Sequence, residues 1–256
     1  MKHWVYWNVA KPLCDWCSPW DGPNSSWWTP TAKEVDRTGW IDRKEDRSFP
    51  ERKSIFIALP KCGHNSIIRG LKPYCHEFIV AHGQCDWIFR SSRAHVCKLA
   101  TPSEKWNSYL KFTFVRNPYS RVLAAWEEMN HNYNYKKKFK DLLLDIYEGK
   151  EDLGCGDRVI NERARAHLKP AWEDLIDLEG NLLVDYVARF EDFDKEYNYI
   201  RDLMGLKQVD AAPWLNKKPS TEKRMHNGHR DWYDNECKAL VSEIYRSDIE
   251  KFKYEF

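Results

Sequence analysis

The sequence has no apolar run long enough to cross a membrane. A transmembrane helix requires roughly 20 consecutive apolar residues, and no apolar run in the 256-residue sequence approaches that length. The first four residues, Met-Lys-His-Trp, also lack the pattern of a signal peptide. From these two absences we expect a soluble, cytoplasmic protein without a membrane span.

Neither sign of charge is in excess. The chain has 41 Lys and Arg against 39 Asp and Glu, which gives a formal net charge of +2 at pH 7. Binding to nucleic acid depends on a concentrated positive surface, so we expect no nucleic-acid partner. The longest basic run, residues 136–138, predicts an exposed helix start.

Cysteine is too sparse for a disulfide scaffold. The 256 residues include 8 cysteines, scattered along the chain. Only Cys14 and Cys17 have the spacing of a zinc site, and no second pair of ligands follows them. We therefore interpret this pair as reduced thiols and expect no metal.

The composition and the periodicity of the sequence change near residue 50. Residues 1–50 lack helical or strand periodicity, yet they are rich in tryptophan, at positions 4, 7, 16, 20, 27, 28 and 40. Disordered segments are poor in aromatic residues, so we predict an arm that packs on a domain formed by residues 51–256. Its rings either cover apolar surface of that domain, which we favour, or form a wall for an acceptor.

From residue 51 apolar runs alternate with helical patterns. We predict strands at 55–59, 109–115 and 183–189, with shorter candidates at 77–80 and 87–90. We predict helices at 66–71, from Pro118 onward, and at 139–147, 158–168, 192–204 and 232–245. This alternation favours an α/β fold with a central, mostly parallel sheet flanked by helices.

Two of the predicted strands run directly into a turn that carries a cation. Residues 55–66 place Lys61 where the first strand stops, and residues 112–121 place Arg116 where the second one stops. A helix follows each turn, so backbone N–H groups and the positive end of a helix converge there. The pair predicts a ligand with phosphate-like charge at both ends.

These segments resemble a known family. Residues 60–66 (Pro-Lys-Cys-Gly-His-Asn-Ser) resemble the 5′-phosphosulfate loop of the sulfotransferase family that includes Golgi carbohydrate sulfotransferases. Residues 114–121 resemble its 3′-phosphate strand and turn, and residues 184–193 and 244–254 resemble its later segments. The resemblance covers residues 52–256 with all segments in family order. A Walker loop is absent, because Lys61 precedes the glycine.

The resemblance implies a P-loop-like, nucleotide-kinase-like sulfotransferase fold and a PAPS-dependent enzyme. Such an enzyme moves a sulfuryl group from 3′-phosphoadenosine 5′-phosphosulfate to an acceptor hydroxyl, here of a carbohydrate or small molecule, by in-line displacement. Lys61 would be catalytic, stabilising the leaving phosphate, and no metal is implied. The residues implied to bind the 5′ end are Lys61, Cys62, Gly63, His64, Asn65 and Ser66.

At the other end of the donor, the resemblance assigns the 3′-phosphate to Arg116, with Ser120 one helical turn on. Relatives carry a serine eight residues after this arginine, where this chain has Ala124, so one hydroxyl contact is lost that Ser120 can replace. Lys217 and Lys218 lie in a late loop that either closes over the nucleotide or is solvated.

The candidate general base is His95, 21 residues before Arg116. Some hexuronic-acid sulfotransferases place a catalytic histidine at nearly this spacing, and an imidazole suits deprotonation of an alcohol near neutral pH. His64 is an alternative. We interpret Arg121 as part of a structural ion pair, and Cys62 as a small side chain that fills its turn rather than a reactive thiol.

Two other functions stay open. A nucleotide kinase with a variant phosphate loop would bind ATP with magnesium. A non-catalytic member of the same fold would bind nucleotide or glycan without transfer, which Ala124 and Ala171 favour, since both replace polar residues of the family pattern.

Overall fold

The computed structural model describes most of the chain after the N-terminal arm: residues 53–81, 94–132, 135–156, 158–206, 213 and 228–256. The predicted tryptophan-rich arm (1–50) and the strand candidate at 87–90 lie outside the described residues. So does the part of the late loop that carries Lys217 and Lys218.

Within this described part of the chain, four parallel strands form one sheet in the order β2-β1-β3-β4. They are β1 (Ser54–Ile57), β2 (Phe78–Ala81), β3 (Leu110–Val115) and β4 (Tyr186–Arg189). The central strands β1 and β3 are almost entirely buried, as expected where helices cover both faces of a parallel sheet. The predicted α/β architecture is confirmed.

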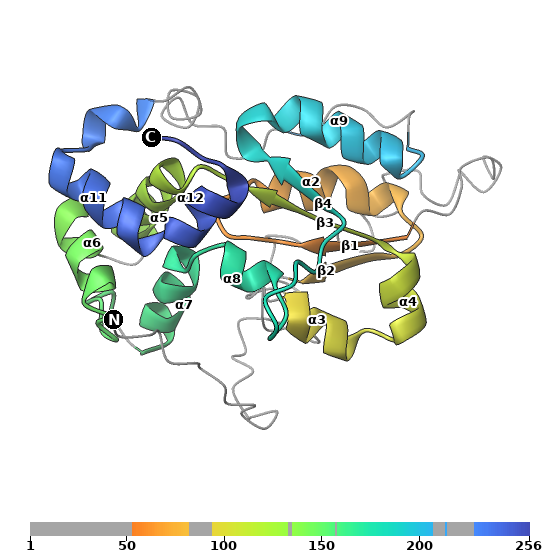
Figure 1. The fold of residues 1–256 in the computed structure, drawn as a ribbon, viewed down its shortest axis with the longest axis horizontal. Coiled ribbons are helices and arrows are strands. Elements are labelled where there is room, and N and C mark those ends of the chain that lie inside the picture. Colours follow the sequence, from red (N-terminus) through yellow and green to blue (C-terminus); the bar gives the residue numbers. More distant parts are fainter. Residues whose placement is uncertain (1–52, 82–93, 133–134, 157, 207–212, 214–227) are drawn as a thin grey trace.

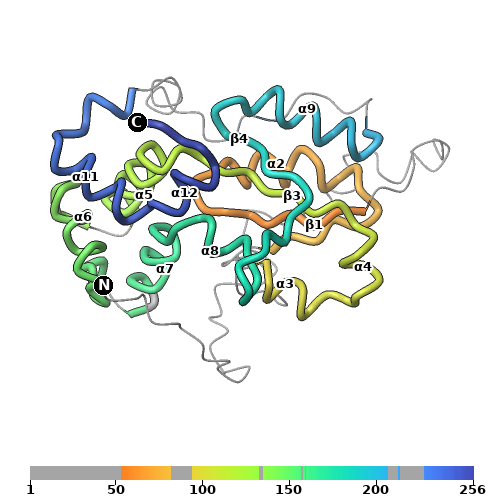
Figure 2. The backbone as a smooth tube through the Cα atoms, viewed as in Figure 1, coloured from red at the N-terminus to blue at the C-terminus, as the bar shows by residue number. Residues whose placement is uncertain are grey.

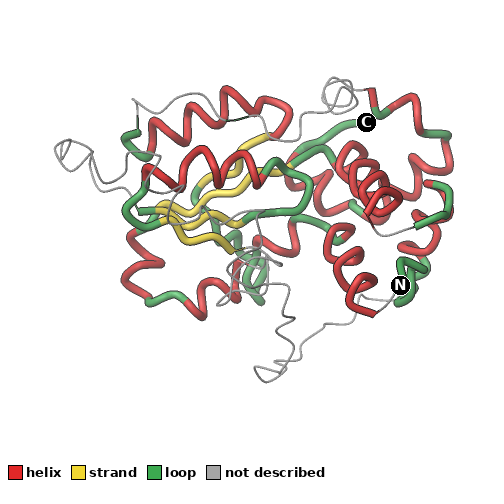
Figure 3. The backbone as a smooth tube through the Cα atoms, turned by 180° about the vertical axis from the view of Figure 1, so that it is seen from behind, coloured by secondary structure: helices red, strands yellow, loops and turns green. Residues whose placement is uncertain are grey.

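Helices cover both faces of the sheet (Figures 1 and 3). On one face lie α2 (His64–Leu71) and α9 (Phe193–Leu203). On the other lie α3 (Ala94–Ala100) and α8 (Trp172–Leu175), which pack together, with α4 (Ser103–Ser108) beside them. The residues facing each layer alternate along the strands, because successive side chains of a strand point to opposite faces.

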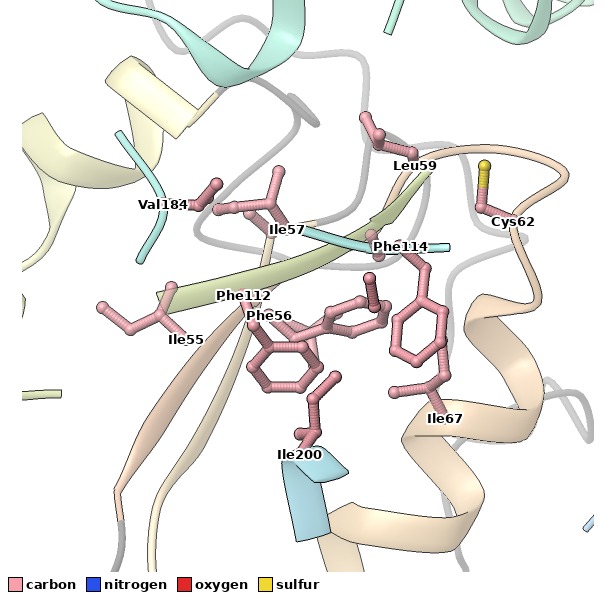
Figure 4. Packing of buried hydrophobic residues seen from close by; sticks show 14 of the residues in the cluster. Ile55, Phe56, Ile57, Leu59, Cys62, Ile67, Phe112, Phe114, Val184 and Ile200 are labelled. Carbon is pink, nitrogen blue, oxygen red and sulfur yellow. The ribbon is translucent and has the colours of Figure 1, made fainter. Parts of the chain in front are cut away.

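The core on the α2–α9 face is aromatic. Phe56 and Phe112 stack with their ring centroids 5.0 Å apart, and Ile200 of α9 lies against them (Figure 4). Phe114 and Ile67 of α2 pack beside that pair, while Ile55 and Ile57 project to the opposite face with Val184 (Figure 4). This packing holds β1 and β3 in register, so the two strands end at the same edge of the sheet.

A second core lies beyond the carboxyl edge of the sheet, where the helices gather in Figure 2. It is built from α5 (Pro118–Asn132), α6 (Phe139–Tyr147), α7 (Arg158–Leu168) and α11 (Asn235–Ile244), with α12 (Arg246–Phe252) linking it to the sheet. Short 3₁₀ turns cover Lys72–Tyr74, Phe190–Asp192 and Arg230–Trp232. Within the described ranges, none of the helices combines the length and the apolar character needed to span a bilayer.

Several predicted boundaries differ from the structure, among them the end of the strand at 55–59, which is at Ile57, and the start of the helix at 66–71, which is at His64. Two further starts were predicted too early for local reasons. The strand predicted at 183–189 begins only at Tyr186, because the backbone N–H of Leu183 turns back to the Leu175 carbonyl. The helix predicted from residue 232 begins at Asn235, because the Asp234 carboxylate accepts a hydrogen bond from the Cys237 N–H at 2.7 Å and caps the helix there.

The predicted structural role of Arg121 is confirmed. Its guanidinium is buried on α5, donates to the Lys169 carbonyl at 2.7 Å and pairs with the Asp248 carboxylate of α12 at 3.3 Å. Asp248 also accepts the backbone N–H groups of Ala171 and Trp172, each at 2.8 Å. One carboxylate therefore ties α5, α8 and α12 together.

Replacing Asp248 by alanine should destabilise the fold by about 3–5 kcal/mol, because it leaves the buried Arg121 guanidinium without its counter-charge and two backbone N–H groups without their acceptor. Urea unfolding measures this loss. The control is Glu243→Gln, which breaks the exposed pair with Arg246 and should cost about 1 kcal/mol or less. Equal losses in the two variants would contradict the tie assigned to Asp248.

Candidate functional site

The site lies at the carboxyl ends of β1 and β3, which are hydrogen-bonded neighbours in parallel register. Ile57 pairs with Thr113, and the Thr113 hydroxyl donates to the Ile57 carbonyl at 2.7 Å. The turn after each strand therefore leaves the sheet at the same edge. In open α/β sheets this edge is where ligands bind.

The turn from β1 into α2 has a backbone conformation that few residues adopt. Lys61 has φ +65°, and Gly63, directly before α2, has φ +78°. A Cβ atom on Gly63 would lie 2.8 Å from Cε2 of Phe190. Strained non-glycine backbone of this kind concentrates at functional sites. In the described residues no side-chain hydrogen bond caps α2 at Gly63, and the start of a helix is a favourable place for an anion.

Arg116 joins the two turns. Its Nη1 donates to the Lys61 carbonyl at 3.2 Å, while Nε and Nη2 donate to the Ser120 hydroxyl at 2.9 and 2.7 Å. The side chain is only 4% exposed, and its guanidinium lies over the Phe190 ring, 4.8 Å from the centroid. The structure thus brings together three of the predicted residues, Lys61, Arg116 and Ser120.

Lys61 contacts a residue that the sequence did not single out. Its ammonium forms an ion pair with the Glu128 carboxylate of α5. The two side chains are 19% and 23% exposed, so the pair lies at the edge of solvent rather than in the core. The lysine predicted to handle a leaving group is therefore held beside a carboxylate in the structure.

A second carboxylate holds the backbone beneath the site. Glu191 accepts the Asn117 backbone N–H at 2.7 Å and the Tyr254 hydroxyl at 2.9 Å. The Asn117 side-chain amide in turn donates to the Glu255 carbonyl at 2.8 Å. The β3–α5 turn is thereby fixed from the 3₁₀ turn after β4 on one side and from residues 254–255 on the other.

Cys62 fills its turn, as the sequence suggested. The side chain is 1% exposed, and its thiol donates to the Pro60 carbonyl at 3.4 Å. Burial raises the pKa of the Cys62 thiol to about 12, although Arg121 and Arg116 act in the opposite direction. Cys62 is therefore protonated at neutral pH and is not a nucleophile.

The other predicted site residues have different surroundings. His64, Asn65 and Ser66 form the first turn of α2, where their backbone N–H groups point out of the helix. His95 lies half-buried in the first turn of α3, the helix that packs against α8. Lys217 and Lys218 lie outside the described residues. Their roles stay predictions.

Sequence reasoning missed Glu128 and Phe190. Glu128 stands eight residues after Ser120, so the helical spacing was a usable signal once Ser120 had been chosen. Phe190 belongs to a segment already recognised, but its position between Gly63 and Arg116 depends on how the turns pack.

Gly63→Ala should destabilise the chain by about 2 kcal/mol or more. Alanine is strained in the left-handed backbone conformation, and its Cβ also displaces the Phe190 ring. Gly149→Ala is the matched control. It has φ +71° with no atom near its added Cβ, and it should lose only the backbone part of about 1 kcal/mol. Urea unfolding of both variants measures the difference; equal losses would mean that Phe190 does not constrain the turn.

Comparison with known proteins places these features in a family. Residues 50–255 match the profile of the Sulfotransferase family. Carbohydrate sulfotransferase 11 of Mus musculus and that of Rattus norvegicus are each 24% identical to this chain over 166 residues, which is 57% of the chain and 47% of the relative. The chain therefore spans about half the length of these curated relatives.

Among solved structures, a sulfotransferase from Alicyclobacillus acidocaldarius is 14% identical and aligns over 79% of this chain and 99% of its own, with a TM-score of 0.38. The family profile covers both turns, the Phe190 segment and α12 in one continuous match. The resemblance inferred from the sequence is confirmed: the chain belongs to the sulfotransferase family.

Proposed function

We propose that the protein transfers a sulfuryl group from 3′-phosphoadenosine 5′-phosphosulfate to a hydroxyl of an acceptor. The observation that carries this proposal is the hydrogen bond from the Arg116 guanidinium to the Lys61 carbonyl. It makes one site from two turns, each with a cation and a helix start. A nucleotide with a phosphate at each end of its ribose matches that distribution of charge.

Lys61 is the residue we assign to the leaving group. Sulfuryl transfer resembles phosphoryl transfer in that the protein must align two partners and stabilise charge on the departing oxygen. Lys61 stands between the end of β1 and the start of α2, whose first N–H groups (His64, Asn65, Ser66) would hold the 5′-phosphate. Gly63 permits the close approach of backbone to phosphate.

Arg116 is assigned to the 3′-phosphate, with Ser120 holding it in place. The Ser120 hydroxyl accepts two hydrogen bonds from the guanidinium, so its own proton is available to an oxygen of the ligand. Ala124 lies one turn further along α5. Ser120 thus supplies the hydroxyl that the family pattern places at position 124.

The acceptor we propose is a carbohydrate hydroxyl, as the name of the relatives suggests, with a small-molecule alcohol as the alternative. Transfer to a hydroxyl requires a group that takes its proton. His95, from the sequence, and Glu128, from the structure, are the two candidates. A cytoplasmic location stays a prediction.

The nucleotide preference tests the donor directly. Adenosine 3′,5′-bisphosphate should bind more tightly than ADP with magnesium in a calorimetric titration, because only the former fills both ends of the site. Arg116→Lys should weaken its binding about tenfold or more, since a lysine cannot reproduce the guanidinium fork. Arg69→Lys, an exposed change on α2, is the control. Preference for ADP with magnesium would favour a kinase instead.

Transfer itself tests the reaction. With labelled donor and a panel of glycan and alcohol acceptors, Lys61→Ala should lower kcat by about 10²–10³-fold, because it removes the cation at the leaving group. Lys72→Ala, just past the end of α2, should retain activity. Wild-type protein that binds the bisphosphate but transfers to no acceptor would support a non-catalytic, nucleotide-binding protein and contradict the proposal.

A further inference from the structure

Glu128 occupies a position that a site for an anion would ordinarily avoid. Its carboxylate contacts the Lys61 ammonium, at the end of the site where the transferable group would lie. Two negative groups in proximity repel each other, so a carboxylate here weakens donor binding unless it has a compensating role. The position of Glu128 on α5 and its contact with Lys61 indicate that role.

The geometry of α5 directs Glu128 into the site. Ser120, Ala124 and Glu128 follow one another at intervals of four residues, so they lie on one face of the helix. The first of them contacts Arg116 and the last contacts Lys61. This face therefore runs along the site from the 3′-phosphate end to the reactive end, and Glu128 stands at the reactive end.

The charge on Glu128 depends on where the Lys61 ammonium is. In the structure Lys61 neutralises Glu128. When Lys61 turns to the oxygen that bridges phosphate and sulfur, Glu128 loses its cation and gains an anionic neighbour. Both changes favour the protonated form of a carboxylate. Glu128 then becomes a stronger base as the reaction is assembled, at the reactive end of the site.

We propose that Glu128 is the general base, a role that rests on the proposed sulfuryl transfer. Glu128 takes the proton from the acceptor hydroxyl as the new S–O bond forms. The bridging S–O bond breaks, and its electron pair leaves with the 5′-phosphate, which Lys61 stabilises. Oε2 of Glu128 is buried, but the side chain as a whole is 23% exposed, and the proton passes on to solvent when the products leave.

This assignment favours Glu128 over His95. Glu128 contacts Lys61 directly, whereas His95 is carried by α3, which packs with α8 on the sheet face opposite α2. The spacing of 21 residues between His95 and Arg116 suggested His95, but that spacing does not show which side chains of α5 face the site. A different role for Glu128, closing the empty site by pairing with Lys61, would leave His95 as the base.

The experiment compares Glu128→Gln with Glu127→Gln. Glutamine keeps the size of the side chain and removes its basicity, and the neighbouring position makes the same chemical change on another face of α5. Two quantities are measured for each: kcat with the best acceptor, and the Kd for adenosine 3′,5′-bisphosphate by calorimetry. Glu128→Asp and His95→Gln complete the set.

Glu128→Gln should lower kcat about 10²-fold or more, while it binds the bisphosphate as tightly as the wild type or more tightly, because a negative neighbour has gone. Glu128→Asp should recover part of kcat, since it restores a carboxylate. Glu127→Gln should match the wild type in both measurements.

Three results would overturn the assignment. One is a kcat for Glu128→Gln within about threefold of the wild type, even with tighter binding, since the pair would then only close the empty site. Another is lost bisphosphate binding in Glu128→Gln, which would make Glu128 a structural partner of Lys61. The third is a loss of kcat in His95→Gln alone. If the wild type is active, any of these three results contradicts only the general-base assignment, and the proposed sulfuryl transfer stands. If the wild type is inactive, the proposed sulfuryl transfer itself is contradicted.

Discussion

The site depends on one hydrogen bond between two turns, from the Arg116 guanidinium to the Lys61 carbonyl. It forms because β1 and β3 are adjacent and in register, so that both chains leave the sheet at the same height. The Phe56–Phe112 stack holds the two strands in register. The Phe190 ring packs against both Gly63 and the Arg116 guanidinium. Core packing, turn geometry and ligand-binding residues are therefore one continuous structure.

The charges of the site have distinct tasks. Glu191 accepts a backbone N–H and a hydroxyl, so it fixes the β3–α5 turn. Glu128 instead pairs with the Lys61 ammonium, and both side chains are partly exposed. Asp248 neutralises Arg121 in the core and leaves the guanidinium of Arg116, five residues earlier, to the site. Glu191 and Asp248 accept backbone N–H groups and hold elements together, whereas Glu128 pairs with the lysine that we assign to the leaving group.

Much of this could be predicted from the sequence, where local signals were strong. Continuous apolar runs identified the central strands, and the predicted helices at 139–147 and 158–168 are confirmed as α6 and α7. The short helices α3 and α4 were not predicted, because six or seven residues carry too little periodicity. The turns were found from their cations and glycine, but the Glu128 contact required the orientation of α5 relative to β1.

A crystal structure with adenosine 3′,5′-bisphosphate tests the central claim most directly. The account predicts one molecule across both turns, with its 5′-phosphate on the first N–H groups of α2 beside Lys61. Its 3′-phosphate should contact Arg116 and Ser120, and Lys61 should have turned from Glu128 to the 5′ end. A nucleotide bound elsewhere, or one that contacts only one of the two turns, would contradict the account.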